Sequence, residues 1–212
     1  MRMTGSQRRE QLLDVGRAVF AERGFEGASI EEIAARAGVS KPVVYEHFGG
    51  KEGIYAVVVD REIASLLDAV LTSLHARHPR ALLEQGVLGL LRYIEANTDG
   101  FRILARDSPS PSVGGNFASL LTDVVARLEP ILADMFTPRG YDPKLAPVYA
   151  QALVGMVAST GLWWLDARKP PLEVVAAHLV NLAWNGLAGL DPTPRLQSTR
   201  RQTRQRGVSA PA

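Results

Sequence analysis

Apolar residues recur at helical spacing along most of the chain, and no stretch alternates as a strand would. From Ser6 to Arg23 they lie three or four residues apart, and Gly24 then supplies a left-handed stop. Two shorter helical segments follow, Ser29 to Ala37 and Ser40 to Phe48, and from Lys51 the helices become long. The sequence therefore predicts an all-α fold with about nine helices in total.

The boundaries of the first short helices follow from capping residues. Ser29 and Glu32 have the spacing of a capping box, in which each side chain satisfies a free backbone amide. Ser40 can cap the next helix, and Pro42 is tolerated because amides in a first helical turn have no helical partner. Residues 1–50 are therefore expected to form a three-helix head.

The rest of the chain divides into a larger helical domain, expected over residues 51–191, and a tail, 192–212. Pro130 is expected to kink or divide its helix. The tail is rich in Pro, Thr, Gln, Arg and Ser, which bury too little apolar surface to order a chain, so we expect it to be disordered. Long helices are predicted over residues 51–76, 80–97, 100–106, 117–136, 144–167 and 171–189.

The net charge of the chain neither supports nor excludes a polyanionic partner. The formal charge is +2, but five arginines follow the last acidic residue, Asp191, and without them the chain carries −3. Residues 1–50 contain seven basic and seven acidic residues. An argument for DNA binding must therefore depend on where the charges lie.

Several classes of protein are disfavoured. The absence of Cys removes disulfides, thiolate zinc sites and cysteine nucleophiles, and suits a reducing cytoplasm. No nucleotide-binding glycine motif, zinc-protease motif or nucleophile elbow is found, so neither an enzyme nor a cofactor or metal is expected. Residues 145–165 carry no charge and are long enough to span a bilayer, but Pro147, Gln151 and many small residues favour a soluble helix.

The short helices have the spacing of a helix-turn-helix, with Gly38-Val39-Ser40 as the turn. Ile33 and Ala37 are expected to pack inward, and Val44 and Phe48 anchor the second helix. A longer string of residues resembles the TetR family of bacterial repressors over about residues 8–60. It comprises Gly24-Phe25, Ser29-Ile30, Ile33-Ala34, Ala37-Gly38-Val39-Ser40, Tyr45, His47-Phe48 and Lys51-Glu52.

A recognition helix presents its first residues to base edges in the major groove, so Lys41, Pro42 and Val43 are the candidates to read sequence, with Ser40 beside them. Lys41 contacting only phosphate is the alternative.

The resemblance implies phosphate contacts for Tyr45, His47 and Lys51, and Ser29 is expected to cap its helix and meet phosphate. The alternatives are that Tyr45 packs on the first helix and that His47 is a solvated surface residue. Glu46 is expected to point away from DNA, because phosphates repel it.

The resemblance also implies a homodimer on a palindromic double-stranded operator, released by an unknown small effector. Apolar helices near the end favour pairing there, and apolar inner helices favour a hydrophobic effector; ordinary core packing is the alternative for both sets. The expected interface is Gly155, Ser159, Trp163, Trp164, Trp184 and Gly186, and the expected pocket is Tyr93, Phe101, Phe117 and Met156. An activator, or a scaffold whose helix-turn-helix only packs, remains an open alternative.

Overall fold

The computed structural model describes residues 3–76, 78–105 and 117–195, and these ranges contain α-helices and short 3-10 turns but no strand. The predicted all-α fold is confirmed. The α-helices are α1 (Gly5–Gly27), α2 (Ile30–Ala37), α3 (Lys41–Phe48), α4 (Lys51–Leu71), α5 (Pro79–Ala96), α6 (Thr98–Ala105), α7 (Phe117–Phe136), α8 (Ala146–Ala167) and α9 (Leu172–Ala188). Two 3-10 turns, Thr137–Arg139 and Pro143–Leu145, lie between α7 and α8.

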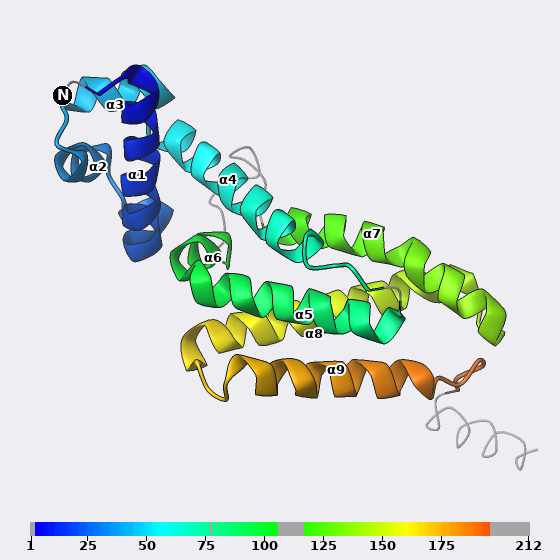
Figure 1. The fold of residues 1–212 in the computed structure, drawn as a ribbon. Helices are drawn as coiled ribbons and strands as arrows, with labels where there is room; N and C mark the ends of the chain where they lie inside the picture. Colours follow the sequence, from blue (N-terminus) through cyan, green and yellow to red (C-terminus); the bar gives the residue numbers. More distant parts are fainter. Residues whose placement is uncertain (1–2, 77, 106–116, 196–212) are drawn as a thin grey trace, which may run out of the picture.

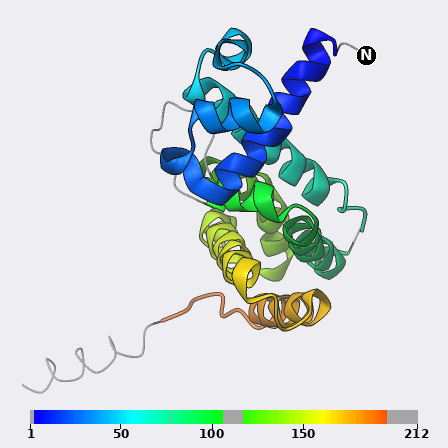
Figure 2. The same cartoon turned by 90° about the vertical axis from the view of Figure 1, so that its left-hand side faces the viewer.

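Helices α1, α2 and α3 gather at one end of the molecule, and α4 leads away from them into the remaining helices (Figure 1). We call the first group the head and α5–α9 the body. Within the body α9 packs against α5, and α8 packs against α7. Figure 2 looks onto the head, with the body behind and below it.

The first helix continues beyond its predicted stop. Gly24 has a left-handed φ of 70°, as expected, but helical hydrogen bonding resumes after this kink and ends at Gly27. At the other end Thr4 and Gln7 form a capping box that the sequence reading missed. The residues after this kink, from Phe25 to Ala28, lie beside Lys51 at the start of α4.

Helix α4 ends at Leu71, five residues before the predicted end. The hydroxyl of Thr72 donates to the carbonyl of Asp68 at 2.6 Å, and such local bonds compete with helix continuation. The following amides of His75 and Ala76 donate to Oε1 of Gln85, at 2.8 and 3.0 Å. A long side chain from α5 therefore stabilises the turn in place of helical bonds.

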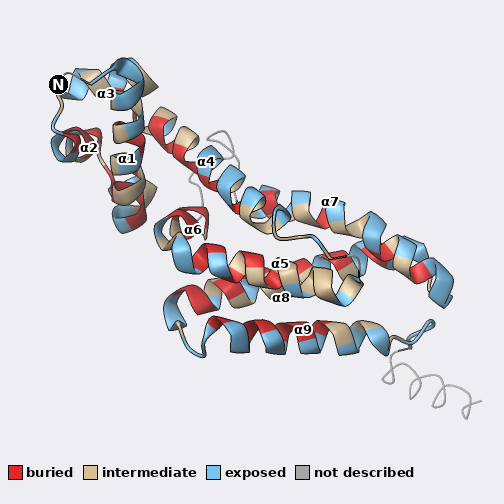
Figure 3. Cartoon of the chain, viewed as in Figure 1, coloured by how far each residue is buried: buried red, intermediate tan, exposed pale blue. Residues whose placement is uncertain are grey.

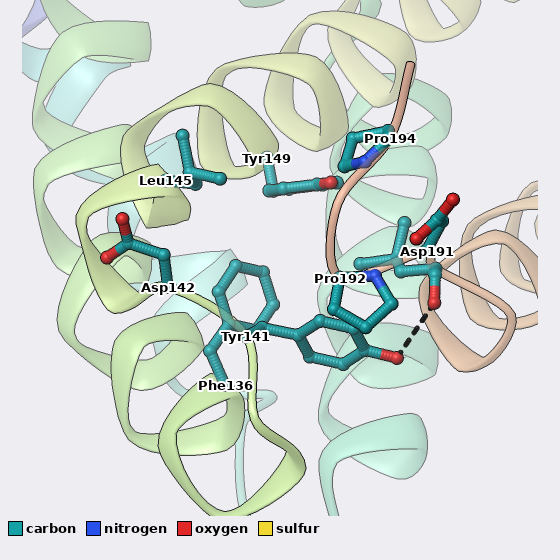
Figure 4. A pocket seen from close by; sticks show the side chains of 9 residues that line it. Phe136, Tyr141, Asp142, Leu145, Tyr149, Asp191, Pro192 and Pro194 are labelled. Carbon is teal, nitrogen blue, oxygen red and sulfur yellow. Dashed lines mark hydrogen bonds between the residues drawn. The ribbon is translucent and has the colours of Figure 1, made fainter.

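Pro130 does not divide α7, which continues to Phe136, so that part of the prediction is wrong. Pro130 is exposed. Of the predicted tail, residues 192–195 are exposed and outside any helix, and residues 196–212 lie outside the described ranges. Figure 4 shows Pro192 and Pro194 beside a hollow of about 10 Å³, where the Tyr141 hydroxyl donates to the carbonyl of Leu190 at 3.0 Å. That volume holds about one water molecule.

Candidate DNA-binding surface and ligand cavity

The helix-turn-helix is built as the sequence predicts. Gly38 ends α2 in the left-handed conformation, and its amide donates back to the last turn of that helix. Ile33 and Val44 are fully buried, and Ala37 nearly so, where α2 packs against α1 and α3. The inner faces of both helices are thereby occupied, so the outer face of α3 has a fixed orientation.

The outer face of α3 begins at its N-terminus. Ser40, Lys41 and Pro42 are exposed, and Tyr45 is 45% exposed. Figure 3 shows exposed and half-buried residues along α3. Ser40 precedes the helix but makes no capping bond with its side chain, contrary to expectation. Val43 is only half-exposed because it packs on the head core.

Lys41 carries the positive charge at this N-terminus, and it is paired with Glu31 of α2. The hydrogen bond to Glu31 raises the pKa of Lys41, and the same bond lowers the pKa of Glu31. The Lys41 ammonium also lies 5.8 Å from the centre of the Tyr45 ring. Both ions are exposed to solvent, where such pairs are weak, so Lys41 can exchange this partner for another anion.

Lys51 has an internal role that its sequence position did not reveal. Its ammonium donates to the carbonyls of Phe25 and Ala28, at 3.0 and 3.3 Å, and lies 4.4 Å from the centre of the Phe25 ring. Phe25 lies in the last turn of α1 and Ala28 follows that turn, so neither carbonyl has a helical amide as partner. Two of the three ammonium donors therefore hold the end of α1 against the start of α4, and one remains for a phosphate.

The remaining predicted phosphate contacts, Ser29 and His47, lie at the start of α2 and near the end of α3. The hydroxyl of Ser29 accepts from the amide of Glu32 at 3.1 Å, which confirms the cap, and His47 is half-buried beside the ring of Phe48. Arg9 of α1 lies over the ring of Phe48, with its guanidinium carbon 4.6 Å from the ring centre. Arg9 is therefore held close to the end of α3, which the N-terminal sequence alone did not indicate.

The body contains a cavity of about 270 Å³, close to the lower limit of typical ligand sites. Helices α4, α5, α7 and α8 and the end of α9 supply its walls. Arg127 is the single charged side chain among its lining residues, and it lies on α7 one turn before the exposed Ile131. The cavity therefore suits a predominantly hydrocarbon molecule.

Only one of the four residues predicted for the pocket lines this cavity. Phe117 does so, at the start of α7. Tyr93 and Phe101 are buried in the core instead, and Met156 is a half-buried residue packed against that core. The prediction failed because helical periodicity identifies inward-facing residues but not the gap between two particular helices. The actual walls are mostly leucines and valines.

The predicted interface residues divide between the surface and the core. Ser159 and Gly186 are exposed, Gly155 has open space beside it, and the Trp163 side chain is 54% exposed. Trp164 is a correction, because it is 2% exposed and its indole donates to the carbonyl of Pro170 at 2.9 Å. Trp184 is a second correction, since it lines the cavity and contacts the ring of His78.

Within residues 3–76, 78–105 and 117–195, no three His, Asp or Glu side chains come together as a metal site would require. In the same ranges one stretch, Pro143–Ala167, is long and apolar enough to cross a membrane by length and composition. In this structure α8, which forms most of it, packs against α7 and α5.

Known proteins share this architecture. Residues 12–58 match the bacterial regulatory proteins of the tetR family, and residues 79–186 match the tetracyclin repressor-like C-terminal domain. The HTH-type transcriptional activator FasR of Mycolicibacterium smegmatis is 29% identical over 191 residues, which cover 88% of this chain and 86% of FasR. The HTH-type transcriptional repressor AcnR of Corynebacterium diphtheriae is 31% identical over 65 residues, 31% of this chain and 34% of AcnR.

A solved structure extends the similarity to the whole fold. The crystal structure of a TetR-like transcriptional regulator from Rhodococcus sp. RHA1 superposes with a TM-score of 0.72 at 26% identity, covering 89% of this chain and 100% of that chain. The N-terminal and C-terminal regions of the chain therefore each match a domain of the same family. The protein belongs to the TetR family of DNA-binding transcriptional regulators.

Proposed function

We propose that this protein is a cytoplasmic homodimer that represses transcription from a palindromic operator and leaves the DNA when a small hydrophobic effector binds. Residues 1–50 act as the DNA-binding domain and residues 51–191 as the regulatory and pairing domain. The observation that carries the proposal is the exposed N-terminal face of α3, held outward by a buried helix-turn-helix core. A helix end presented in this way enters the major groove of DNA.

Lys41 is the proposed base-reading residue. Its ammonium leaves Glu31 on binding and donates to guanine O6 or N7, while Pro42 and the accessible part of Val43 contact thymine methyl groups. Tyr45, His47 and the third donor of Lys51 bind phosphates, together with Ser29 and Ser40. These contacts hold the head in register and carry no sequence information of their own.

Pairing through α8 and α9 is supported by large apolar side chains that solvent would otherwise surround. Val148, Trp163 and Leu182 are 63%, 54% and 64% exposed, and Gly155 and Gly186 leave room for close helix approach. We propose that two copies bury this face in a four-helix bundle. One head reads few base pairs, whereas two heads roughly 34 to 36 Å apart read a palindrome.

The cavity is the proposed effector site. Its walls are almost entirely aliphatic, so an effector gains affinity there by leaving water, and Arg127 near the exposed Ile131 suits an acidic end group. Release requires only that the effector binds better to a conformation whose head spacing no longer fits both half-sites.

Activation is the second candidate, because the relative that matches over most of the chain, FasR, is named an activator. Repression is preferred because a dimer bound across a promoter blocks polymerase with no further contact. In vitro transcription from the bound promoter separates the two candidates. A fall in transcript supports repression, and a rise supports activation.

The experiment that tests DNA recognition is fluorescence anisotropy with labelled DNA from upstream of the protein's own gene, in the presence of excess competitor DNA. Saturable binding that survives the competitor supports the proposal. Tyr45→Ala should weaken binding to all sequences, and Lys41→Ala should change base preference. Arg80→Ala, an exposed change on α5, is the control and should bind as the unaltered chain does.

A negative result has a defined meaning as well. If no upstream fragment is retained against competitor, selection from a random DNA pool follows. A pool from which no sequence is enriched would overturn the proposal, and the helix-turn-helix would then serve only for packing.

A further inference from the structure

Glu62 is the one buried charged side chain within the residues that the structure describes, and it lies where head and body meet. It belongs to α4. Nε of Arg17, on α1, donates to its Oε1 at 2.6 Å, and the hydroxyl of Tyr93, on α5, donates to its Oε2 at 2.8 Å. Helices α1, α4 and α5 are therefore joined through one carboxylate.

This arrangement depends on all its partners being in place. A buried carboxylate costs several kcal/mol unless it is paired and hydrogen-bonded. Burial, together with the hydrogen bond to Glu62, raises the pKa of Tyr93 far above its ordinary value, so the phenol keeps its proton and remains a donor. Moving any of the three helices alone would take at least one partner from a buried charge, so the cluster stabilises this arrangement of the helices.

A fourth helix meets the carboxylate through Gly100 of α6. A Cβ atom at this position would lie 1.7 Å from Oε2 of Glu62 and 2.9 Å from Nη2 of Arg17, so a side chain larger than hydrogen does not fit. The neighbouring Phe101 is fully buried and contacts the ring of Phe117 edge-on, with the centroids 5.7 Å apart. Phe117 in turn lines the cavity, so contacts run from the cavity to the carboxylate.

We propose that Glu62 is a positioning residue that fixes the angle between head and body, and that the contents of the cavity change this angle through Phe117, Phe101 and Gly100. The second part rests on the proposed effector function, whereas the first part holds without it. In this arrangement the effector does not act on the head directly. It shifts α6, and α6 displaces the carboxylate that holds α1.

The test measures the head-to-body distance in the full chain without DNA or effector. The sequence contains no Cys, so cysteines introduced at the exposed positions Glu46 and Lys144 are the only labelling sites. Spin labels there report the distance distribution by pulsed EPR, with excess unlabelled chain so that each doubly labelled copy is measured alone. We expect a narrow distribution for the otherwise unaltered chain.

Tyr93→Phe removes one hydrogen bond to the carboxylate and keeps the ring, and Gly100→Ala forces the carboxylate to move. Both should broaden or shift the distribution. Tyr141→Phe is the matched control, because it removes a comparable hydroxyl bond, to Leu190 in the body, and should leave the distribution unchanged. An unchanged distribution in both Glu62-cluster variants, with their helicity retained, would overturn the positioning role.

The relay from the cavity is tested in the same assay with Phe117→Ala. Leu153→Ala, which also removes cavity-lining atoms but on α8, is its control. A broader or shifted distribution for Phe117→Ala alone supports the relay. Equal distributions for the two variants would overturn it. Neither outcome depends on DNA binding, so failure of the proposed function and failure of this inference are separable.

Discussion

The head and the body are held together in different ways. In the head, the buried side chains form a continuous core, and the ion pair of Arg36 with Glu22 bridges α2 and α1 from outside. In the body, α5, α7, α8 and the end of α9, together with α4, line a cavity whose walls are almost entirely apolar. The cavity thus lies in the region proposed to accept an effector, whereas the core of the head supports the surface proposed to contact DNA.

The largest expected effect is a difference in the loss of stability between a substitution in the core of the head and one beside the cavity. Leu12→Ala, at a fully buried position in the head, should reduce the free energy of unfolding by about 3 to 5 kcal/mol, because it creates a new void. Leu128→Ala, beside the existing cavity, should cost less than about 2 kcal/mol. Urea unfolding followed by circular dichroism measures both. Equal costs would contradict the contrast.

A substitution of Lys51 tests whether the stability of the head also depends on side-chain hydrogen bonds. Lys51→Met keeps the apolar stem and loses the bonds to the carbonyls of Phe25 and Ala28, which should cost about 1.5 to 3 kcal/mol. All three tryptophans lie in the body, so their fluorescence reports the body alone while circular dichroism reports both regions. We expect the circular dichroism transition to move to lower urea. A shift confined to fluorescence would argue against a head-specific role.

A substitution that fills the cavity tests the same comparison between head and body by adding atoms instead of removing them. Gly86→Leu, on α5, directs a side chain into the cavity, where the nearest atom, Cδ2 of Leu74, lies 3.7 Å from the position of a Cβ. It should raise stability by about 0.5 to 2 kcal/mol and abolish any response to effector, with operator affinity retained. Gly86→Ala separates the gain in helix propensity from the filling itself. Loss of stability in both variants would mean that the cavity has no room for the added atoms.

The smallest expected effect is a loss of stability at acidic pH. Hydrogen bonds from Arg61, Arg36 and Lys41 lower the pKa values of Glu10, Glu22 and Glu31, all on α1 or α2. A carboxyl whose pKa is lower in the folded state stabilises the protein above its ordinary pKa, here 4.5, and loses that contribution as the pH falls below it.

The urea midpoint from circular dichroism should therefore decrease between about pH 5 and pH 3, and modestly, since all three groups are exposed. Glu22→Gln removes one of these carboxyls and should flatten the dependence slightly. An identical pH profile in that variant would show that its pair with Arg36 contributes nothing.

How much the sequence could predict differs between the two regions for the same physical reason. The head is specified by local signals, because Gly38 must adopt a left-handed turn and Ser29 caps within three residues, so the helices and the outer face of α3 were predictable. The partners of Lys51 and Arg9 were not, because they arise where α1, α3 and α4 meet. Helix α4 ended early through Gln85, a residue from the next helix.

In the body, helical periodicity gave the helices and showed which residues face inward, but not what they face. Tyr93 has the pattern of a pocket residue, yet it contacts a carboxylate 31 positions earlier in the chain. Trp164 and Trp163 are adjacent and alike in the sequence, but one is core and the other is surface. Such distinctions depend on how helices cross, and a single sequence holds no direct record of those crossings.

Arg168 connects the end of α8 to the start of α6. Its guanidinium donates to the hydroxyl of Thr98 at 2.6 Å and to the carbonyl of Ile94 at 3.3 Å. Because α8 carries part of the proposed pairing face and α6 carries Gly100, the two are tied at this point. A substitution on the pairing face would then alter the angle of the head as well as the dimer. In a screen for loss of operator binding, such a variant would be mistaken for one with damaged base recognition, although every residue proposed to contact DNA is intact.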